Sequence, residues 1–246
     1  SVSAGRRPAD TEKRLPTPSR NSTVTGIPYQ QQLSAPYGRT CGAAALAMVY
    51  ASLGLPDCQK AVWSQIAGED KDVRRTTGSF RLARHALDRG LSAAVLQAAR
   101  PWDTLASCWF TGARVILNHR LRPDSPLGHF SVLAGFDDDE VFVHDPQFGP
   151  FRRLTRDRLL RLWLPSAGGS EIVGHVLVAI ASRDDQPNRC DSCGAMVPAQ
   201  VGCGRCGNLV PLRPVAALGC SKRDCGARLW KYVFCPCCDF PTGEVE

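Results

Sequence analysis

The fold depends most on one stretch of sequence, Thr40-Cys41-Gly42-Ala43-Ala44-Ala45-Leu46-Ala47-Met48-Val49-Tyr50, in which a cysteine precedes a run of strong helix formers. Alanine, leucine and methionine favour a helix, and Gly54 is a natural end for it. Cys41 is therefore expected in the first turn, where free backbone N–H groups and the helix dipole favour an anion. Such a position can convert a thiol into a reactive thiolate. A buried core cysteine fits this stretch equally well when it is taken alone.

The composition is that of a globular protein. The chain has 246 residues, 43% of them apolar, which suffices for one domain of ordinary size and a smaller one. Its formal net charge is +7, but basic and acidic residues are interspersed over most of the chain, so nucleic-acid binding is possible but not indicated. No apolar run is long enough to span a membrane, and the first residues lack the apolar core of a signal peptide.

The cysteines divide the chain into two parts. Of twelve, three are scattered through the first three quarters, and nine crowd between Cys190 and Cys238. The first residues are rich in Ser, Thr, Arg and Pro and have too few apolar side chains to fold. We therefore predict four segments: a disordered basic arm (1–26), a main domain (27–182), a polar linker (183–189) and a cysteine-rich module (190–246).

Within the main domain, helical patterns come first and strands follow. Apolar periodicity predicts helices over 57–67 and 79–89 and a helix starting at Pro101, with one short strand over 91–97 between them. Runs rich in β-branched residues then predict strands over 114–119, 129–136, 140–145, 151–154 and 171–182, with a helix over 156–164. Helices followed by an antiparallel sheet indicate the α+β class.

A hairpin brings two polar residues together. Asp137-Asp138-Asp139 reads as its turn, and His129 and Asp145 are equidistant from Asp137, so the two are expected directly opposite each other. An aspartate there can hydrogen-bond one imidazole nitrogen and leave the other free. With the thiol of Cys41, these residues form a candidate set of nucleophile, base and orienting group.

Each member of this set also has an ordinary structural interpretation. His129 could be a half-buried strand histidine, and Asp145, before Pro146, is a common way to start a turn. His144 would point to the opposite face of its strand, and the other histidines have no acidic partner in register. The coincidence of three signals in one small domain favours the catalytic interpretation.

The residues also resemble a known family. Gln32, Cys41-Gly42 opening an Ala/Leu/Met helix, the stretch 128–133 (Gly-His-Phe-Ser-Val-Leu) and His144-Asp145-Pro146 are similar to the papain-like peptidases that cleave double-glycine leaders from bacteriocin precursors. The stand-alone relatives without a transporter are the closer match. The resemblance covers about residues 27–182 and implies a papain-like fold with a cysteine and a histidine facing each other across a cleft.

The resemblance also implies roles for particular residues. Cys41 would be the nucleophile, His129 the general base and acid, and Asp145 the orienting residue, while Gln32 would help to form the oxyanion hole. The loop between Gln32 and Cys41 is longer than in the leader peptidases, so Gln31 or Gln30 could replace Gln32.

The reaction expected from these parts is hydrolysis of a peptide bond in a protein or peptide substrate through a thioester acyl-enzyme. Two alternatives stay open at this point. One is another amide hydrolase or acyltransferase, since these reactions share the first step. The other is an inactive papain-like binding module that acts through its cysteine-rich part.

That cysteine-rich part has the spacing of zinc ligands. Two Cys-x-x-Cys-Gly knuckles can supply four thiolates, and zinc takes such sets tetrahedrally. The segment resembles double zinc ribbons. We predict two structural zinc ions, the first held by Cys190, Cys193, Cys203 and Cys206 and the second by Cys220, Cys225, Cys235 and Cys238. Cys237 is left over and could replace Cys235 or Cys238.

A disulfide framework is the alternative, but an odd number of cysteines in paired knuckles fits metal better. Zinc-bound thiolates must stay reduced, which predicts a cytoplasmic protein. Zinc ribbons of this kind usually contact other macromolecules, so the module is expected to recruit the substrate or a protein partner.

Overall fold

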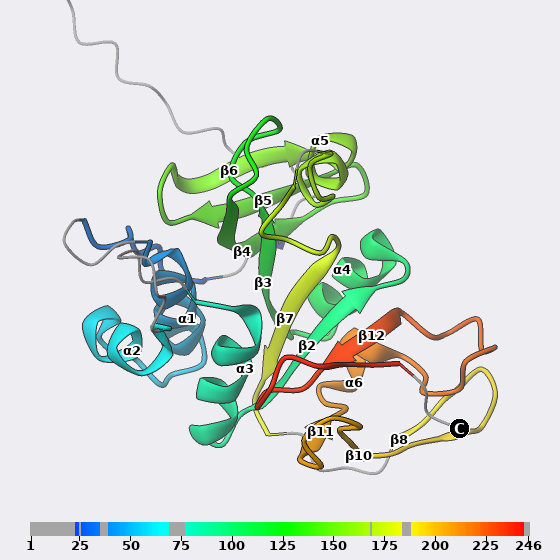
Figure 1. Cartoon of the computed structure of the whole chain (residues 1–246). Coiled ribbons are helices and arrows are strands. Elements are labelled where there is room, and N and C mark those ends of the chain that lie inside the picture. The colour runs from blue at the N-terminus through cyan, green and yellow to red at the C-terminus, as the bar shows by residue number, and fades with distance from the viewer. Residues whose placement is uncertain are drawn as a thin grey trace, which may run out of the picture.

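One large antiparallel sheet with helices on both faces forms the body of the molecule (Figure 1). The computed structural model describes residues 23–24, 26–34, 39–68, 77–167, 169–183 and 188–243. The helices are α1 (Cys41–Ser52), α2 (Gln59–Ile66), α3 (Ser79–Asp88), α4 (Pro101–Phe110), α5 (Arg156–Leu162) and α6 (Val215–Leu218). The main strands are β2 (Ser92–Ala98), β3 (Arg114–Arg120), β4 (Gly128–Phe136), β5 (Glu140–Asp145), β6 (Gly149–Thr155), β7 (Val176–Ala181) and β12 (Trp230–Phe234).

The strands of this sheet follow the order β13-β12-β2-β7-β3-β4-β5-β6. Every neighbouring pair is antiparallel, and a short strand, β1 (Thr23–Val24), pairs with the end of β4. The α+β prediction is confirmed. Most of the arm predicted over 1–26 lies outside the described residues, but its residues Thr23 and Val24 are in β1.

The central strands alternate between two apolar layers. In β7, Val178 and Ile180 join the layer that holds α1, α2 and α3, whereas Leu177 and Ala179 join the layer that holds α4 and α5. A strand covered on both faces is expected to be apolar at every position. The uninterrupted apolar run of β7 is therefore explained by burial on both sides.

The helix α1 lies in the middle of the first layer and is almost wholly enclosed. All residues from Cys41 to Tyr50 are buried. Its second residue, Gly42, has no room for a side chain, because an added Cβ would lie 2.8 Å from Thr77 and 3.3 Å from Leu82 and Phe130. This close approach sets the start of α1 against β4, which carries Phe130.

The predicted element boundaries hold within a few residues, with one exception. The last strand of the main domain was expected from Glu171, but β7 begins at Val176. Gly174 and His175 have φ values of +100° and +52°, which lie outside the range of extended strands. Residues 171–175 consequently form a loop.

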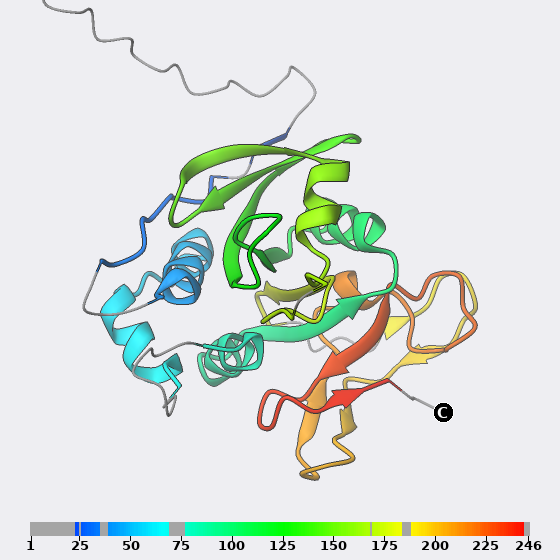
Figure 2. The same cartoon turned by 45° about the horizontal axis from the view of Figure 1, so that its top comes forward.

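The cysteine-rich part combines small hairpins with a continuation of the large sheet. Strands β8 (Asn188–Arg189) and β9 (Met196–Val197) form one hairpin, and β10 (Gln200–Gly202) and β11 (Leu209–Pro211) form another. Strand β12 pairs with β2 and also with β13 (Pro241–Thr242), as the red and teal strands in Figure 2 show. The large sheet therefore contains strands from both sides of the predicted linker. The division of the chain into a domain and a module stays a prediction.

Candidate active site

Cys41 opens α1 and is one of the residues that line a cavity of about 330 Å³. The same cavity is lined by Arg39 on the preceding loop, by Gly78 before α3, and by Gly128 and Phe130 of β4. The thiol is thus placed at a helix start, as the sequence predicts, on a wall that faces the first residues of β4. A helix start next to a cavity offers backbone N–H groups to an anion.

His129 and Asp145 also meet, although not in the predicted register. Phe136 pairs with Val141, but the register shifts by one residue at a bulge between Leu133 and Gly135. Beyond the bulge Val132 pairs with His144, so Asp145 lies beside Ser131 and diagonal to His129. The expectation of directly opposite residues was therefore wrong.

The bulge is what puts the two side chains on one face of the sheet. Side chains alternate between the faces of a strand, and the register at the turn, if continued, would set Asp145 opposite Val132. A bulge adds one residue to one strand and reverses this alternation. It brings the carboxylate to the face of His129, and diagonal neighbours are within reach of long side chains.

Asp145 is held by several donors. Nε2–H of His129 donates to its Oδ1 at 2.8 Å, and the backbone N–H groups of Gln147 and Phe148 donate to the same oxygen at 3.0 and 3.1 Å. The Arg152 guanidinium donates to Oδ2. Burial opposes the ionisation of Asp145, but the hydrogen bond and charge of His129, together with the other donors, lower its pKa to about 2.

His129 therefore has Nδ1 left for Cys41. Burial disfavours a charged imidazole, yet the hydrogen bonds to Asp145 and Cys41 and the charges of both groups raise the pKa of His129 to about 9. Burial likewise opposes the thiolate, but the hydrogen bond and charge of His129 and the N–H of Phe130 lower the pKa of Cys41. These opposite shifts favour a thiolate–imidazolium pair.

Three charged residues of this site, Arg39, Glu171 and Arg152, were not predicted from the sequence. Arg39 spans the cavity, because it forms hydrogen bonds of 2.6 and 2.8 Å with Glu171 and also donates to the carbonyl of Gly128. Its charge adds to the lowering of the Cys41 pKa. The third residue, Arg152, donates to Asp145. Glu171 and Arg152 are far from Cys41 in the sequence, so no local pattern could place them in the site. Arg39 lies two residues before Cys41, and this position was the one local signal that could have identified it.

The loop of Gln32 lies beside the same site. Its backbone N–H donates to the carbonyl of Pro146, next to Asp145, at 2.9 Å. Gln30 is directed elsewhere, since its side-chain oxygen accepts from Gln59 of α2 at 3.2 Å. Residues 35–38 of the connection to Cys41 lie outside the described residues. The assignment of Gln32 to the oxyanion hole stays a prediction.

The neighbouring histidines have other partners. His144 bonds the carbonyl of Ile27 at 2.8 Å and accepts from the N–H of Phe151. His119 lies edge-on to His129, with ring centroids 5.6 Å apart, and bonds Ser131 at 2.6 Å. Burial and the charge of His129 lower the pKa of His119 to about 4, so it is neutral beside the charged imidazole.

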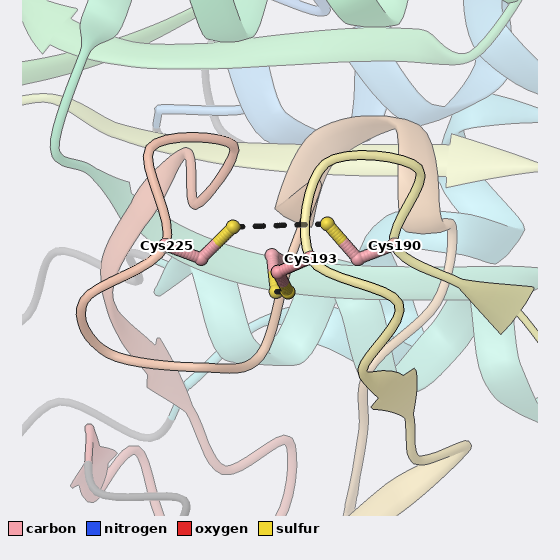
Figure 3. A group of neighbouring side chains, drawn as sticks. Cys190, Cys193 and Cys225 are labelled. Carbon is pink, nitrogen blue, oxygen red and sulfur yellow. Dashed lines mark hydrogen bonds between the residues drawn. The ribbon is translucent and has the colours of Figure 1, made fainter.

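The eight predicted metal ligands form two groups, but in a different pairing. Cys190 and Cys193 meet Cys220 and Cys225, while Cys203 and Cys206 meet Cys235 and Cys238. Figure 3 shows Cys190 and Cys225 facing each other from two separate loops, with Cys193 between them. The prediction that the first two knuckles share one site was wrong.

The physical reason for this pairing is the path of the chain. The first knuckle is the turn of the β8–β9 hairpin, the second is the turn of β10–β11, and β9 leads almost directly into β10. Residues 196–202, which include β9 and β10, lie between the two turns. Each turn therefore takes its partners from the second half of the segment.

The two groups fit zinc. Zinc–sulfur bonds of about 2.3 Å in a tetrahedron require sulfurs roughly 3.8 Å apart. In each group, two of the six sulfur–sulfur distances are 3.6–3.7 Å, and all six are within 4.8 Å. Backbone N–H groups donate to the sulfurs of Cys220, Cys225 and Cys235 at 3.4–3.5 Å, which stabilises thiolates. Cys237 is the spare cysteine, exposed and bonded by Arg84 at 3.0 Å.

Comparison with known proteins identifies the family of the peptidase part. Residues 24–159 match the family described as Peptidase_C39 like. The chain belongs to this family. It is accordingly a cysteine peptidase, as the resemblance to the leader peptidases predicted. No curated protein matches the chain.

One solved structure supports the fold. A C39-like peptidase from Bacillus anthracis is 17% identical, with a TM-score of 0.53, and the match covers 66% of this chain and 98% of that one. The peptidase domain of Streptococcus ComA, a bi-functional ABC transporter, is 15% identical, with a TM-score of 0.47 and coverages of 64% and 99%. A double glycine motif protease from an AMS/PCAT transporter is 19% identical, with a TM-score of 0.47, and the match covers 65% of this chain and 94% of that one.

None of the helices in the described part of the chain has both the length and the apolar character to cross a bilayer.

Proposed function

We propose that Cys41, His129 and Asp145 are the catalytic triad of this peptidase. The observation that carries the proposal is a buried imidazole whose Nε2 is bonded to Asp145 while Cys41 interacts with its other side at a helix start. This order, nucleophile to base to orienting carboxylate, is the general arrangement of an activated nucleophile.

The steps follow from these positions. The Cys41 thiolate attacks the carbonyl carbon of a peptide bond, and the oxyanion is met by the Cys41 backbone N–H and the side-chain amide of Gln32. His129 Nδ1–H gives its proton to the leaving amine as the C–N bond breaks, which leaves a thioester. A water then loses a proton to His129 as it attacks the thioester, the C–S bond breaks, and the carboxylic acid is released with the Cys41 thiolate and protonated His129 restored.

We further propose that the two cysteine groups each hold one structural zinc ion. Cys190, Cys193, Cys220 and Cys225 are the ligands of one, and Cys203, Cys206, Cys235 and Cys238 are those of the other. Four protein ligands leave no open position for chemistry, so the metal supplies stability. Thiolates of this kind fit a reducing compartment such as the cytoplasm. The segment would then serve to contact a substrate or a protein partner.

The triad is tested by mass spectrometry after brief treatment with iodoacetamide at pH 6. We expect rapid modification of Cys41, because its pKa is lowered, and slow modification of Cys108, because burial raises its pKa to about 12. His129→Ala should suppress the labelling of Cys41. His175→Asn is the matched control, since asparagine tolerates the φ of +52° found there. Labelling of the exposed Cys58 at the same rate as Cys41 would refute the proposed triad.

A further inference from the structure

A second cavity extends the one at Cys41 towards the cysteine-rich segment. Its volume is about 110 Å³, and it shares three lining residues, Gly78, Asn118 and Glu171, with the cavity that contains Cys41. The two cavities are therefore neighbouring parts of one cleft. A peptide lying across Cys41 can reach the second part with a side chain a few residues from the scissile bond.

The cysteine-rich segment contributes two of the walls. Phe234 ends β12, where it pairs with Val95 of β2, and Asp239 follows directly after the last knuckle. The knuckle fixes both residues, because the Asp239 N–H donates to the carbonyl of Cys235 at 2.9 Å and the Cys235 N–H donates to that of Phe240 at 3.0 Å. The proposed metal ligands Cys235 and Cys238 thus lie between the two lining residues.

The lining combines apolar walls with one uncompensated charge. Val95 and Val176 are buried in the floor, Phe234 is half-buried, and Val173 is 62% exposed at the rim. Among the carboxylates, Glu171 is neutralised by its ion pair with Arg39.

Asp239 is different. Its carboxylate has no ion pair or hydrogen bond with any residue in the described part of the chain, although the chain as a whole is basic. An apolar slot that ends at a free carboxylate is suited to a long aliphatic stem with a cationic head.

We propose that this cavity is a substrate subsite that takes a lysine or arginine side chain, with its stem against Val95 and Phe234 and its head at Asp239. The proposal rests on the proposed function of Cys41. It gives the cysteine-rich segment a direct part in the choice of substrate.

The test uses peptidyl chloromethyl ketones that alkylate Cys41, with Lys, Arg, Leu or Glu placed in turn at each position N-terminal to the reactive group. Internally quenched peptides vary the C-terminal side in the same way. At one position we expect Lys and Arg to exceed Leu by about tenfold, the usual effect of a charge-assisted hydrogen bond, and Glu to be poorest. Asp239→Asn should remove most of this preference, and Asp239→Lys should shift it towards Glu.

Asp224→Asn is the matched control, because Asp224 is an exposed acid beside Cys225 of the other cysteine group and does not line the cavity. It should keep the preference for Lys and Arg. Each variant is also checked for an unchanged metal content per chain, which separates a local effect of Asp239 from a loss of the knuckle.

Three outcomes decide the matter. Equal rates for all four side chains at every position, with Cys41 still alkylated by iodoacetamide, would overturn the subsite and leave the proposed triad intact. A preference for Lys that persists in Asp239→Asn would overturn the role of this carboxylate. Failure of iodoacetamide to modify Cys41 selectively would overturn the triad itself, and the subsite with it.

Discussion

The cleft and the cysteine-rich segment are built in different ways. Of the proposed triad in the cleft, His129 and Asp145 belong to adjacent strands of one hairpin, and Cys41 comes from α1. In the cysteine-rich segment, each group of four joins residues about 30 positions apart, and neighbouring knuckles belong to different groups. Nearness in sequence is therefore a sound guide to partners within a hairpin, and a poor guide where the chain crosses between two sites.

The largest expected effect tests the pairing of the cysteines. In Cys190→Ser/Cys225→Ser both changes fall in one group, so one metal ion per chain should stay bound. In Cys190→Ser/Cys206→Ser the changes fall in both groups, so both ions should be lost and the segment should unfold, since structural zinc supplies about 10–16 kcal/mol in small domains. Metal content and circular dichroism measure this. The sequence-adjacent pairing predicts the reverse result for the two variants.

The next largest effect concerns Asp145. Asp145→Ala leaves the buried His129 without an acceptor, so we expect the rate of Cys41 alkylation at pH 6 to fall by about 100-fold. Asp145→Asn keeps an acceptor oxygen but removes the charge, and a fall of about tenfold is expected. Equal rates in both variants and the unmodified protein would mean that the hairpin contact has no part in activating the thiol.

The coupling of Cys41 to His129 can be measured by NMR titration of the imidazoles. Because the thiolate stabilises the imidazolium, the raised pKa of His129, about 9, should fall in Cys41→Ala. The charged imidazole then gives up its proton at a lower pH than in the unmodified protein. The resonance of His175, whose pKa is lowered by burial, serves as an internal control that should not move. An unchanged His129 titration would contradict the thiolate–imidazolium pair.

The smallest effect is expected at Arg39. Its charge is the last of the contributions that lower the pKa of Cys41, and its side chain is about one-third exposed, so Arg39→Met should slow alkylation at pH 6 by only about two- to fivefold. The difference should shrink at high salt. Arg100→Met, which changes another partly exposed arginine paired with an acid, is the control and should have no effect.

The fold and much of the candidate site could be predicted from local signals. The Ala/Leu/Met run after Cys41 specifies a helix by propensity, and the acidic turn between two β-branched runs specifies a hairpin, so the cysteine, the histidine and the aspartate of the proposed triad were all singled out from the sequence. The bulge in β4 was not, although Gly135 lies directly at it and a glycine inside a strand is a common sign of a bulge. The contact between His129 and Asp145 was thus predicted correctly, but from a strand register that differs from the observed one.

Contacts between residues far apart in the chain could not be predicted from the sequence. The ion pair of Arg39 with Glu171 joins residues 132 positions apart, and no local pattern identifies either as the partner of the other. The same holds for β12. Its aromatic residues Trp230, Tyr232 and Phe234 alternate along the chain, which favours a strand but does not identify the neighbouring strand. That neighbour, β2, lies more than a hundred residues earlier in the chain.

The pairing of β12 with β2 has a consequence for the solubility of the protein. Without β12, strand β2 would be the outer strand of the large sheet, with a row of backbone N–H and C=O groups open to any other strand. Most of its side chains are apolar and it carries no charge, so it lacks the usual protection of an edge against association. The cysteine-rich segment covers this edge, so we expect it to shield the peptidase part from association through β2.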